Sequence, residues 1–286
     1  MEKIKLHDLA RVSHHIRNDL DRAYQNTLDE SCYLRGQAVK DFESNWSQYT
    51  GAEDCAMVTS GTDALHTAAM ITGVGPGDEV IMAAHGFIAT IEPFMHTGAT
   101  IKYVDSKTSD YCIDEEKIEA EITDKTKVIV WTDINGQTPD VDRIIALAKK
   151  HNLWTVEDAA PSAGASYKDR KVGTLADITC FSFGPVKPLG AIGGAGGITG
   201  SNDICDKARE IRSHGRGKGT GRDGRIMKED VMSLPSGQDI QAGNEPSPRL
   251  EEKLKPGFNG KGLYHSVSYT HLRAHETVLD LVCRLL

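Results

Sequence analysis

Lys187 lies in a segment whose residue types suit Schiff-base chemistry. It follows Phe181, Ser182 and Phe183 and precedes a glycine-rich run that ends at Gly197. A lysine held among apolar, small and turn-forming residues loses its charge easily, because desolvation disfavours the ammonium form. A neutral amine is the nucleophile that carbonyl chemistry requires. A lysine on an exposed loop, with glycines that only make turns, explains the segment equally well.

Two features of the sequence could hold a phosphate. The segment Thr59–Asp63 follows an apolar run and opens a helical pattern, so its hydroxyl residues can cap the helix and its free amides can bind an anion. Ser182, five residues before Lys187, can donate a hydrogen bond to the same group. The first segment lacks the Gly-Lys-Ser/Thr ending of an ATP- or GTP-binding loop. An ordinary helix start and a strand-end serine are the simpler alternatives.

A carboxylate pair, Glu157 and Asp158, ends another apolar run and is followed by small residues. An aspartate opposite a pyridine nitrogen keeps that nitrogen protonated and makes the ring an electron sink. Phe87 could stack on such a ring. Helix capping by Asp158 and a core position for Phe87 are the ordinary alternatives. Combined with the lysine and the phosphate cradle, these residues match the requirements of pyridoxal 5'-phosphate.

The elements that must position these residues alternate between short apolar runs and helical patterns. We predict strands at 55–58, 79–83, 100–104, 128–131, 154–156, 178–183 and 197–200. We predict helices at 8–27, 39–49, 63–71, 87–96, 114–121, 141–151 and 204–214. This alternation indicates an α/β fold with a mostly parallel sheet flanked by helices. Ligands bind such sheets at the carboxyl ends of the strands, where the candidate residues lie.

The composition indicates the cellular compartment and argues against some classes of binding partner. Asp and Glu number 41 against 33 Lys and Arg, and the net charge of -8 argues against nucleic acid or a membrane surface as the main partner. The six cysteines include no Cys-x-x-Cys pair, which favours free thiols in a reducing, cytoplasmic setting. We find no signal core and no apolar window that could span a membrane. We attribute the helical spacing of His271 and His275 to chance and expect no metal.

Family motifs occur in order, with family-like spacing, from about residue 36 to residue 215. They include Thr59-Ser60-Gly61-Thr62-Asp63-Ala64-Leu65, Gly75-Pro76-Gly77-Asp78-Glu79-Val80, Phe87-Ile88-Ala89-Thr90, Gly136-Gln137, Glu157-Asp158-Ala159-Ala160 and Phe181-Ser182-Phe183 with Lys187. This part of the chain resembles the DegT/DnrJ/EryC1/StrS family of pyridoxal-phosphate-dependent sugar aminotransferases, which have fold type I. The resemblance implies transfer of an amino group from glutamate or glutamine to a nucleotide-linked keto-sugar, in a homodimer with its active site at the subunit interface.

The resemblance also implies a role for each candidate residue. Lys187 would form the Schiff base with pyridoxal phosphate and move a proton between substrate and cofactor. Asp158 would pair with the pyridine nitrogen, and Phe87 would stack on the ring. The phosphate would be held by Gly61, Thr62, the backbone of Asp63, and Ser182.

Three departures from the family pattern are visible. Pro161 stands where the family often has Gln to hydrogen-bond the ring hydroxyl, and Ser162 could substitute for that donor. Asp133-Ile134-Asn135 stands where a family motif has His, so the sugar contacts do not transfer. We interpret 1–215 as the cofactor-binding large domain. We interpret 216–286 as an irregular tail without the family's small C-terminal domain, from a truncated or frame-shifted gene.

Two other functions fit parts of this pattern. Related sugar dehydratases carry His in place of the Schiff-base lysine, so Lys187 favours transamination. A catalytically impaired, cofactor-binding relic fits a chain in which the domain that closes over the substrate is not recognisable.

Overall fold

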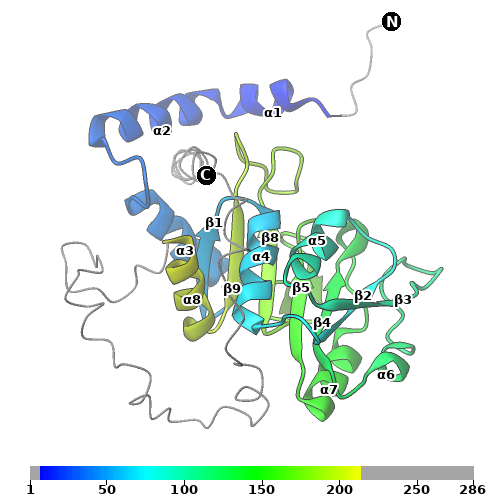
Figure 1. Ribbon diagram of the computed structural model, residues 1–286. Helices are drawn as coiled ribbons and strands as arrows, with labels where there is room; N and C mark the ends of the chain where they lie inside the picture. Colours follow the sequence, from blue (N-terminus) through cyan, green and yellow to red (C-terminus); the bar gives the residue numbers. More distant parts are fainter. Residues whose placement is uncertain (1–6, 214–286) are drawn as a thin grey trace, which may run out of the picture.

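A computed structural model of the chain describes residues 7–213, so the tail at 216–286 and the pair His271 and His275 lie outside the described residues. A seven-stranded sheet with the order β1-β9-β8-β5-β4-β2-β3 forms its centre (Figure 1). Its strands are β1 (Asp54–Val58), β2 (Glu79–Ala83), β3 (Thr100–Val104), β4 (Thr126–Thr132), β5 (Trp154–Asp158), β8 (Ile178–Ser182) and β9 (Gly196–Gly200).

Strand β9 is antiparallel to both of its neighbours, β1 and β8, and every other pair in this sheet is parallel. The strands other than β9 therefore all run in one direction, and their carboxyl ends share one edge. The predicted α/β fold with a mostly parallel sheet is confirmed.

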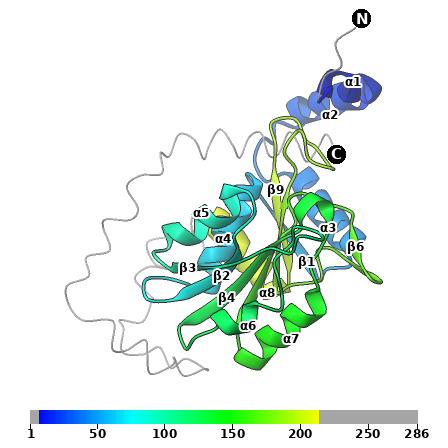
Figure 2. The ribbon, with the colours of Figure 1, turned by 90° about the vertical axis from the view of Figure 1, so that its right-hand side faces the viewer.

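Helices cover both faces of the sheet (Figure 2). One core lies under α3 (Gln37–Thr50), α6 (Ile118–Glu121) and α7 (Val141–His151). The other lies under α4 (Gly61–Thr72), α5 (Ile88–His96) and α8 (Asn202–Arg212). Alternate residues of each strand face opposite cores, as the two-residue period of a strand requires. None of the helices within residues 7–213 is long and apolar enough to cross a lipid bilayer.

The predicted continuous helix at 8–27 is wrong, because the chain forms α1 (Leu9–His15) and α2 (Arg17–Glu30) with a break at Ile16. The Ser13 hydroxyl donates to the Leu9 carbonyl at 3.0 Å, a local bond of the kind that bends helices. Helix α1 buries no residue, so little tertiary packing straightens it. The two helices form an arm that stands apart from the sheet (Figures 1 and 2).

Two shorter elements also differ from the prediction. The helix predicted at 114–121 begins only at Ile118, because the Asp114 carboxylate accepts a hydrogen bond from the Glu116 amide at 3.2 Å and forms a turn. The hairpin of β6 (Ser166–Tyr167) and β7 (Arg170–Lys171) was not predicted. Strands of two residues are too short to show a period in the sequence.

A buried ion network ties α8 to α3 and to β1. Glu43 of α3 is 6% exposed and accepts hydrogen bonds from the Met57 amide at 2.8 Å and from Arg212 Nη1 at 2.6 Å. Arg209 donates to both carboxylate oxygens of Asp54, at 2.6 and 2.9 Å. The network therefore fixes the strand from which the phosphate-binding candidate segment emerges.

Candidate active site

Four strands deliver the candidate residues to one edge of the sheet. The segment with Gly61 and Thr62 follows β1, and Phe87 follows β2. Asp158 is the last residue of β5, and Ser182 is the last residue of β8. Because these strands run in the same direction, all the residues lie at their carboxyl ends, as the sequence predicts.

Asp158 is a buried acid with both oxygens hydrogen-bonded. It is 3% exposed; Thr90 Oγ1 donates to its Oδ2, and the Ala160 amide donates to its Oδ1 at 3.1 Å. Burial raises the pKa of this carboxyl, whereas the bonds from Thr90 and Ala160 and the charge of Lys187 act to lower it. The lysine is therefore near enough to stabilise the Asp158 anion.

Lys187 lies in the turn that follows β8. Its amide donates to the Gly184 carbonyl at 2.9 Å, and its side chain is half-buried. A Cβ on Gly184 would lie 3.5 Å from Lys187 Cγ and 3.6 Å from Ser182 Oγ. The lysine and the serine therefore flank the same glycine. Because the lysine side chain is only half-buried, it is accessible from solvent.

The N-terminus of α4 offers amides that its own hydrogen bonds do not use. The first backbone bond of the helix runs from the Ala64 amide to the Ser60 carbonyl at 2.9 Å. The Asp63 amide donates to Ser60 Oγ at 3.0 Å, so the serine is the cap. Gly61 and Thr62 precede these bonds, and their amides are the ones suited to an anion. The Asp63 amide, expected at the phosphate, is engaged by the cap.

Ser182 and the α4 N-terminus form one cradle. A Cβ on Gly61 would lie 2.6 Å from Ser182 Cβ, so only glycine allows this approach. Gly196 pairs with both Val58 and Ser182, and a Cβ on it would lie 2.1 Å from the Ser60 carbonyl oxygen. Two glycines thus bring β1, β8 and β9 together where the phosphate is expected.

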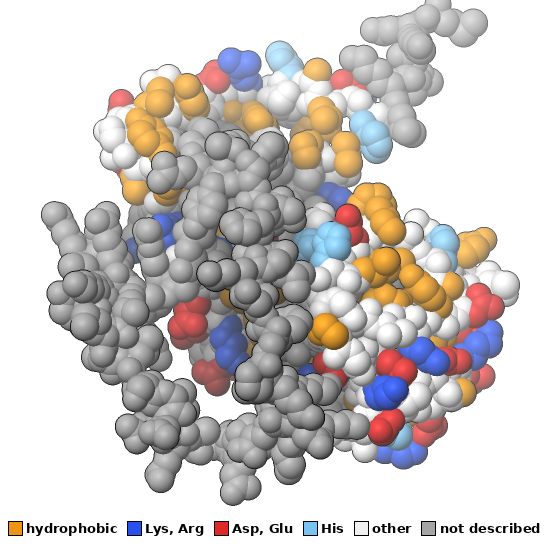
Figure 3. Space-filling view, viewed as in Figure 1, with side chains coloured by type: hydrophobic (Ala, Val, Ile, Leu, Met, Phe, Trp, Pro, Cys, Tyr) orange, Lys and Arg blue, Asp and Glu red, His pale blue; other side chains and the backbone are white. Residues whose placement is uncertain are grey.

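Phe87 is the N-cap residue of α5, and its side chain is 68% exposed. The alternative that it is a core aromatic is therefore wrong. Ile88 and Tyr111 are also exposed, and Figure 3 shows hydrophobic side chains gathered over the region of α5. An exposed ring at the edge that carries Asp158 is free to stack on a bound heterocycle.

The departures from the family pattern at Pro161 and Asp133 change the hydrogen bonds beneath the candidate residues. Ser162 is 2% exposed, and its hydroxyl donates to Asp133 Oδ2 at 2.6 Å. A hydroxyl has one proton to donate, so Ser162 does not replace the family's glutamine donor. Sequence reasoning also missed Thr90, although it stands one turn after Phe87 in a family motif, where its hydroxyl could have been suspected.

The residues fit each part of a pyridoxal phosphate molecule. The cradle suits the phosphate, Asp158 suits the ring nitrogen, Lys187 suits the aldehyde carbon and Phe87 suits a ring face. Within residues 7–213, no group of three or more His, Cys, Asp or Glu side chains is arranged to hold a metal ion.

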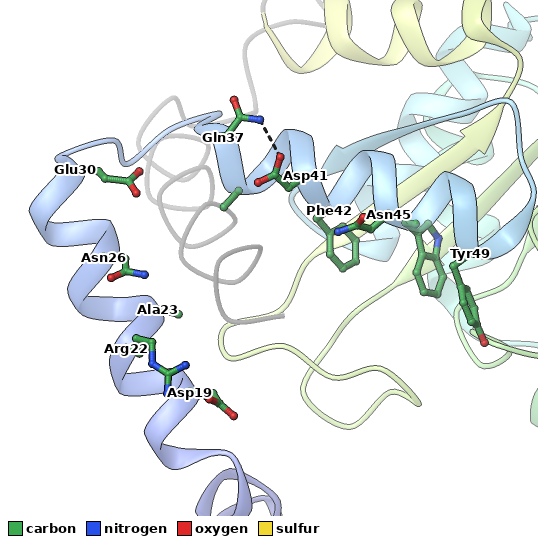
Figure 4. Close-up of a pocket in the computed structure, with 12 residues that line it drawn as sticks. Asp19, Arg22, Ala23, Asn26, Glu30, Gln37, Asp41, Phe42, Asn45 and Tyr49 are labelled. Carbon is green, nitrogen blue, oxygen red and sulfur yellow. Dashed lines mark hydrogen bonds and ion pairs between the residues drawn. The ribbon is translucent and has the colours of Figure 1, made fainter.

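A separate groove lies away from these residues. About 630 Å³ lies between α2 and α3, bordered by Arg22 and Asn26 on one side and by Phe42, Trp46 and Tyr49 on the other (Figure 4). It contains none of the candidate residues; the Arg22 and Asn26 side chains of α2 face α3 across it. We therefore assign the site to the sheet edge and not to this groove.

Two known proteins with related sequences are nucleotide-sugar aminotransferases by name. UDP-2-acetamido-2-deoxy-3-oxo-D-glucuronate aminotransferase of Pseudomonas aeruginosa is 38% identical, over 74% of this chain and 60% of the relative. The dTDP-3-amino-3,4,6-trideoxy-alpha-D-glucose transaminase of Streptomyces venezuelae is 34% identical, over 73% of this chain and 55% of the relative. The chain thus spans between about half and three-fifths of the length of these relatives.

Solved structures show the same fold. S. venezuelae DesV, solved with a ketimine intermediate, superposes with a TM-score of 0.74 at 32% identity, covering 79% of this chain and 61% of DesV. NtdA of Bacillus subtilis, solved with bound cofactor PMP, gives 0.72 at 29% identity, covering 79% of this chain and 52% of NtdA. The model of the DegT/DnrJ/EryC1/StrS aminotransferase family matches residues 14–240, which extends past residue 215, where the motifs stop. The chain belongs to the DegT/DnrJ/EryC1/StrS aminotransferase family.

Proposed function

We propose that this protein is a pyridoxal-phosphate-dependent aminotransferase that transfers an amino group from glutamate or glutamine to a nucleotide-linked keto-sugar. The observation that carries the proposal is the placement of the buried Asp158 carboxylate, at the end of β5, on the same edge of the sheet as Lys187 in the turn after β8. An amine and an acid at one edge of the sheet, beside a phosphate cradle, are what this cofactor needs at its two reactive ends.

Each side chain has a defined task in this proposal. Pyridoxal phosphate, when bound, supplies an electron sink for the carbon that gains or loses the amino group. Asp158 would hold a proton on the ring nitrogen, and the hydrogen bonds from Thr90 and Ala160 favour the ionised form of the acid. Lys187 Nζ would hold the cofactor and would carry a proton to and from the substrate carbon. Phe87 covers one ring face and shields it from water.

The sugar substrate is inferred from the relatives. Both enzymes named above act on nucleotide-linked sugars, one with UDP and one with dTDP. Lys187 also disfavours the related dehydratase function, because those enzymes carry His in its place. The structure has Asp133 and a left-handed Asn135 (φ 55°) in the loop where the family has a histidine motif, so the sugar contacts in this loop differ from the family pattern.

Two further features of the protein belong to the same proposal. We propose a homodimer that buries the apolar surface beside the site, because Phe87 and Ile88 are 68% and 60% exposed at its edge. We propose a cytoplasmic location because Cys55, Cys112, Cys180 and Cys205 are buried free thiols, which a reducing compartment maintains. Sedimentation analysis of the protein with its cofactor tests the dimer, and a monomer at micromolar concentration would contradict it.

Spectroscopy tests the cofactor first. We expect the purified protein with added pyridoxal phosphate to show the visible absorbance of a lysine-bound cofactor and to retain the label on Lys187 after borohydride reduction. Lys187→Ala should lose both signals. The control is Lys149→Ala, which removes an exposed lysine of α7 and should change neither signal. An unchanged spectrum in Lys187→Ala would refute the assignment of the lysine.

Conversion by an amino donor tests the reaction. We expect glutamate or glutamine to replace the lysine-bound absorbance with that of the amine form of the cofactor. If the cofactor binds but neither donor changes the spectrum, the protein is the impaired relic or uses another donor. A subsequent return of the starting spectrum on addition of a nucleotide-linked keto-sugar would identify the acceptor class.

A further inference from the structure

Two buried acids lie next to one another beneath the site. Glu157 of β5 and Asp133, which follows β4, are both 0% exposed. In the parallel register of β4 and β5, Glu157 is paired with Trp131, two residues before Asp133, so both acids face the same side of the sheet. Neither acid has a role in the function proposed above.

In each of these acids, one carboxyl oxygen accepts a hydrogen bond from a neighbouring hydroxyl group and the other oxygen does not. Thr179 Oγ1 donates to Glu157 Oε2 at 2.7 Å, and Ser162 Oγ donates to Asp133 Oδ2 at 2.6 Å. The other two oxygens, Asp133 Oδ1 and Glu157 Oε1, are buried and have no hydrogen-bond partner of good geometry among residues 7–213. The Trp131 indole and the Gly173 amide are near enough to act on the pKa values of Asp133 and Glu157, respectively, and both lower them. The two carboxyl groups are close enough to act as hydrogen-bond partners of each other.

We propose that Glu157 and Asp133 share one proton, carried by Glu157 and donated to Asp133, and that this bond positions Asp158. Two adjacent anions in an apolar interior would be unsatisfied and would repel each other. One proton between the unsatisfied oxygens removes the repulsion and gives both of them a partner.

The charges around the pair agree with this arrangement. Burial raises the pKa of Glu157 well above its ordinary value and that of Asp133 to about 7. The other titratable groups that interact electrostatically with the pair are Asp158 on β5, Cys180 on β8 and Cys112 in the loop before α6. None of these three groups is a cation, so the shared proton is the means of reducing the negative charge.

The pair Asp133 and Glu157 is linked to Asp158 through the turn that follows β5. Ser162, anchored by Asp133, donates its amide to the Ala159 carbonyl at 3.0 Å and closes this turn. The turn presents the Ala160 amide to Asp158 Oδ1, and the Asp133 amide donates to the Asp158 carbonyl at 3.1 Å. Asp133 and Glu157 are thus positioning residues for Asp158. This positioning role rests on the proposed function, in which Asp158 holds the proton of the cofactor ring.

The shared proton is tested on the protein without cofactor. At about pH 8, where an ordinary glutamate is fully ionised, infrared spectroscopy should show the carbonyl band of a protonated carboxylic acid. Glu157→Gln, which keeps the donor but not the titratable proton, should lose that band. Glu115→Gln, a change at another buried glutamate that accepts from Lys107 at 3.0 Å, should keep it. Absence of the band in the unmodified protein, or its persistence in Glu157→Gln, would overturn the proposal.

The pH dependence of unfolding gives a second readout. The folded pKa values of both acids lie above their unfolded values, so the folded state binds more protons, and this contribution to stability is lost as the pH rises from the unfolded values through about 7. We expect the denaturation midpoint of Glu157→Gln to fall less steeply over this range than that of the unmodified protein. Equal slopes would contradict a shared proton.

The positioning role is tested by cofactor binding. Glu157→Gln can still donate to Asp133 and should bind pyridoxal phosphate normally, whereas Glu157→Ala should lose about tenfold in affinity. Equal affinity of these two variants would overturn the positioning role, and so would a loss in Glu157→Gln as large as that in Glu157→Ala. If the unmodified protein binds no pyridoxal phosphate, the proposed function fails, while the infrared result still decides the shared proton.

Discussion

Thr90 of α5 donates a hydrogen bond to the Asp158 carboxylate of β5, and this bond joins the two elements at the active-site edge. The Thr90 amide donates in turn to the Phe87 carbonyl at 3.0 Å, so the same helical turn presents the exposed aromatic ring. The residue expected to stack on the cofactor and the acid expected at its ring nitrogen are therefore held in a fixed relation by one threonine.

Thr90→Val should shift the pH dependence of the site. The Thr90 bond opposes the effect of burial on the pKa of Asp158, so its removal raises that pKa further. The acid must be ionised to hold the ring proton, and activity is lost as the pH falls through its pKa. The acid limb of the activity profile should therefore move to higher pH. Thr97→Val is the control, because its hydroxyl donates to the Phe94 carbonyl at the other end of the same helix, at 2.7 Å; an equal shift in both variants would contradict the prediction.

Asp158→Asn should separate catalysis from stability. The amide has the shape of the carboxyl but carries no charge, so kcat should fall by about 10²- to 10³-fold, the usual effect of removing one electrostatic group from an active site. Thr90 can still donate to the amide oxygen, so the stability cost is limited to the lost bond from the Ala160 amide, about 1–3 kcal/mol. Steady-state kinetics and thermal denaturation measure the two effects. A large fall in the melting temperature would show that the residue is structural.

Gly61→Ala should weaken the phosphate cradle. The added Cβ would lie 2.6 Å from Ser182 Cβ, so the serine and the helix N-terminus must separate. Overpacking of this kind costs about 1–3 kcal/mol of stability, and cofactor affinity should fall as well. Gly75→Ala is a suitable control, since its Cβ would meet only the Thr97 carbonyl oxygen at an ordinary 3.9 Å. Equilibrium dialysis with pyridoxal phosphate gives the comparison, and equal affinities would exclude a cradle at Gly61.

Glu43→Ala should destabilise the protein more than the loss of a surface charge does. It leaves the Arg212 guanidinium, whose side chain is 14% exposed, without its carboxylate partner. Breaking one side of a buried ion pair costs about 3–5 kcal/mol, measured by urea denaturation. Arg17→Ala removes an exposed arginine from a pair with Asp21 and should leave the denaturation midpoint unchanged. Similar midpoints for the two variants would show that the network contributes little.

The sequence alone determined the strands and the residues at their ends. Asp158, Ser182 and the Gly61 segment were predicted at carboxyl ends because apolar runs show where strands stop, and a parallel sheet places those stops along one edge. The family motifs added roles for these residues and for Lys187. Local patterns of this kind survive in the sequence because they depend on neighbours within a few positions.

Only the tertiary structure decided which side chains meet. The bonds of Thr90 to Asp158 and of Ser162 to Asp133 join residues 68 and 29 positions apart. They depend on the strand order and on the register between β4 and β5, which no local pattern encodes. The exposure of Phe87 and the contact between Asp133 and Glu157 have the same origin. The sequence thus named the chemistry of the site, and the packing of distant segments determined how each group is held and charged.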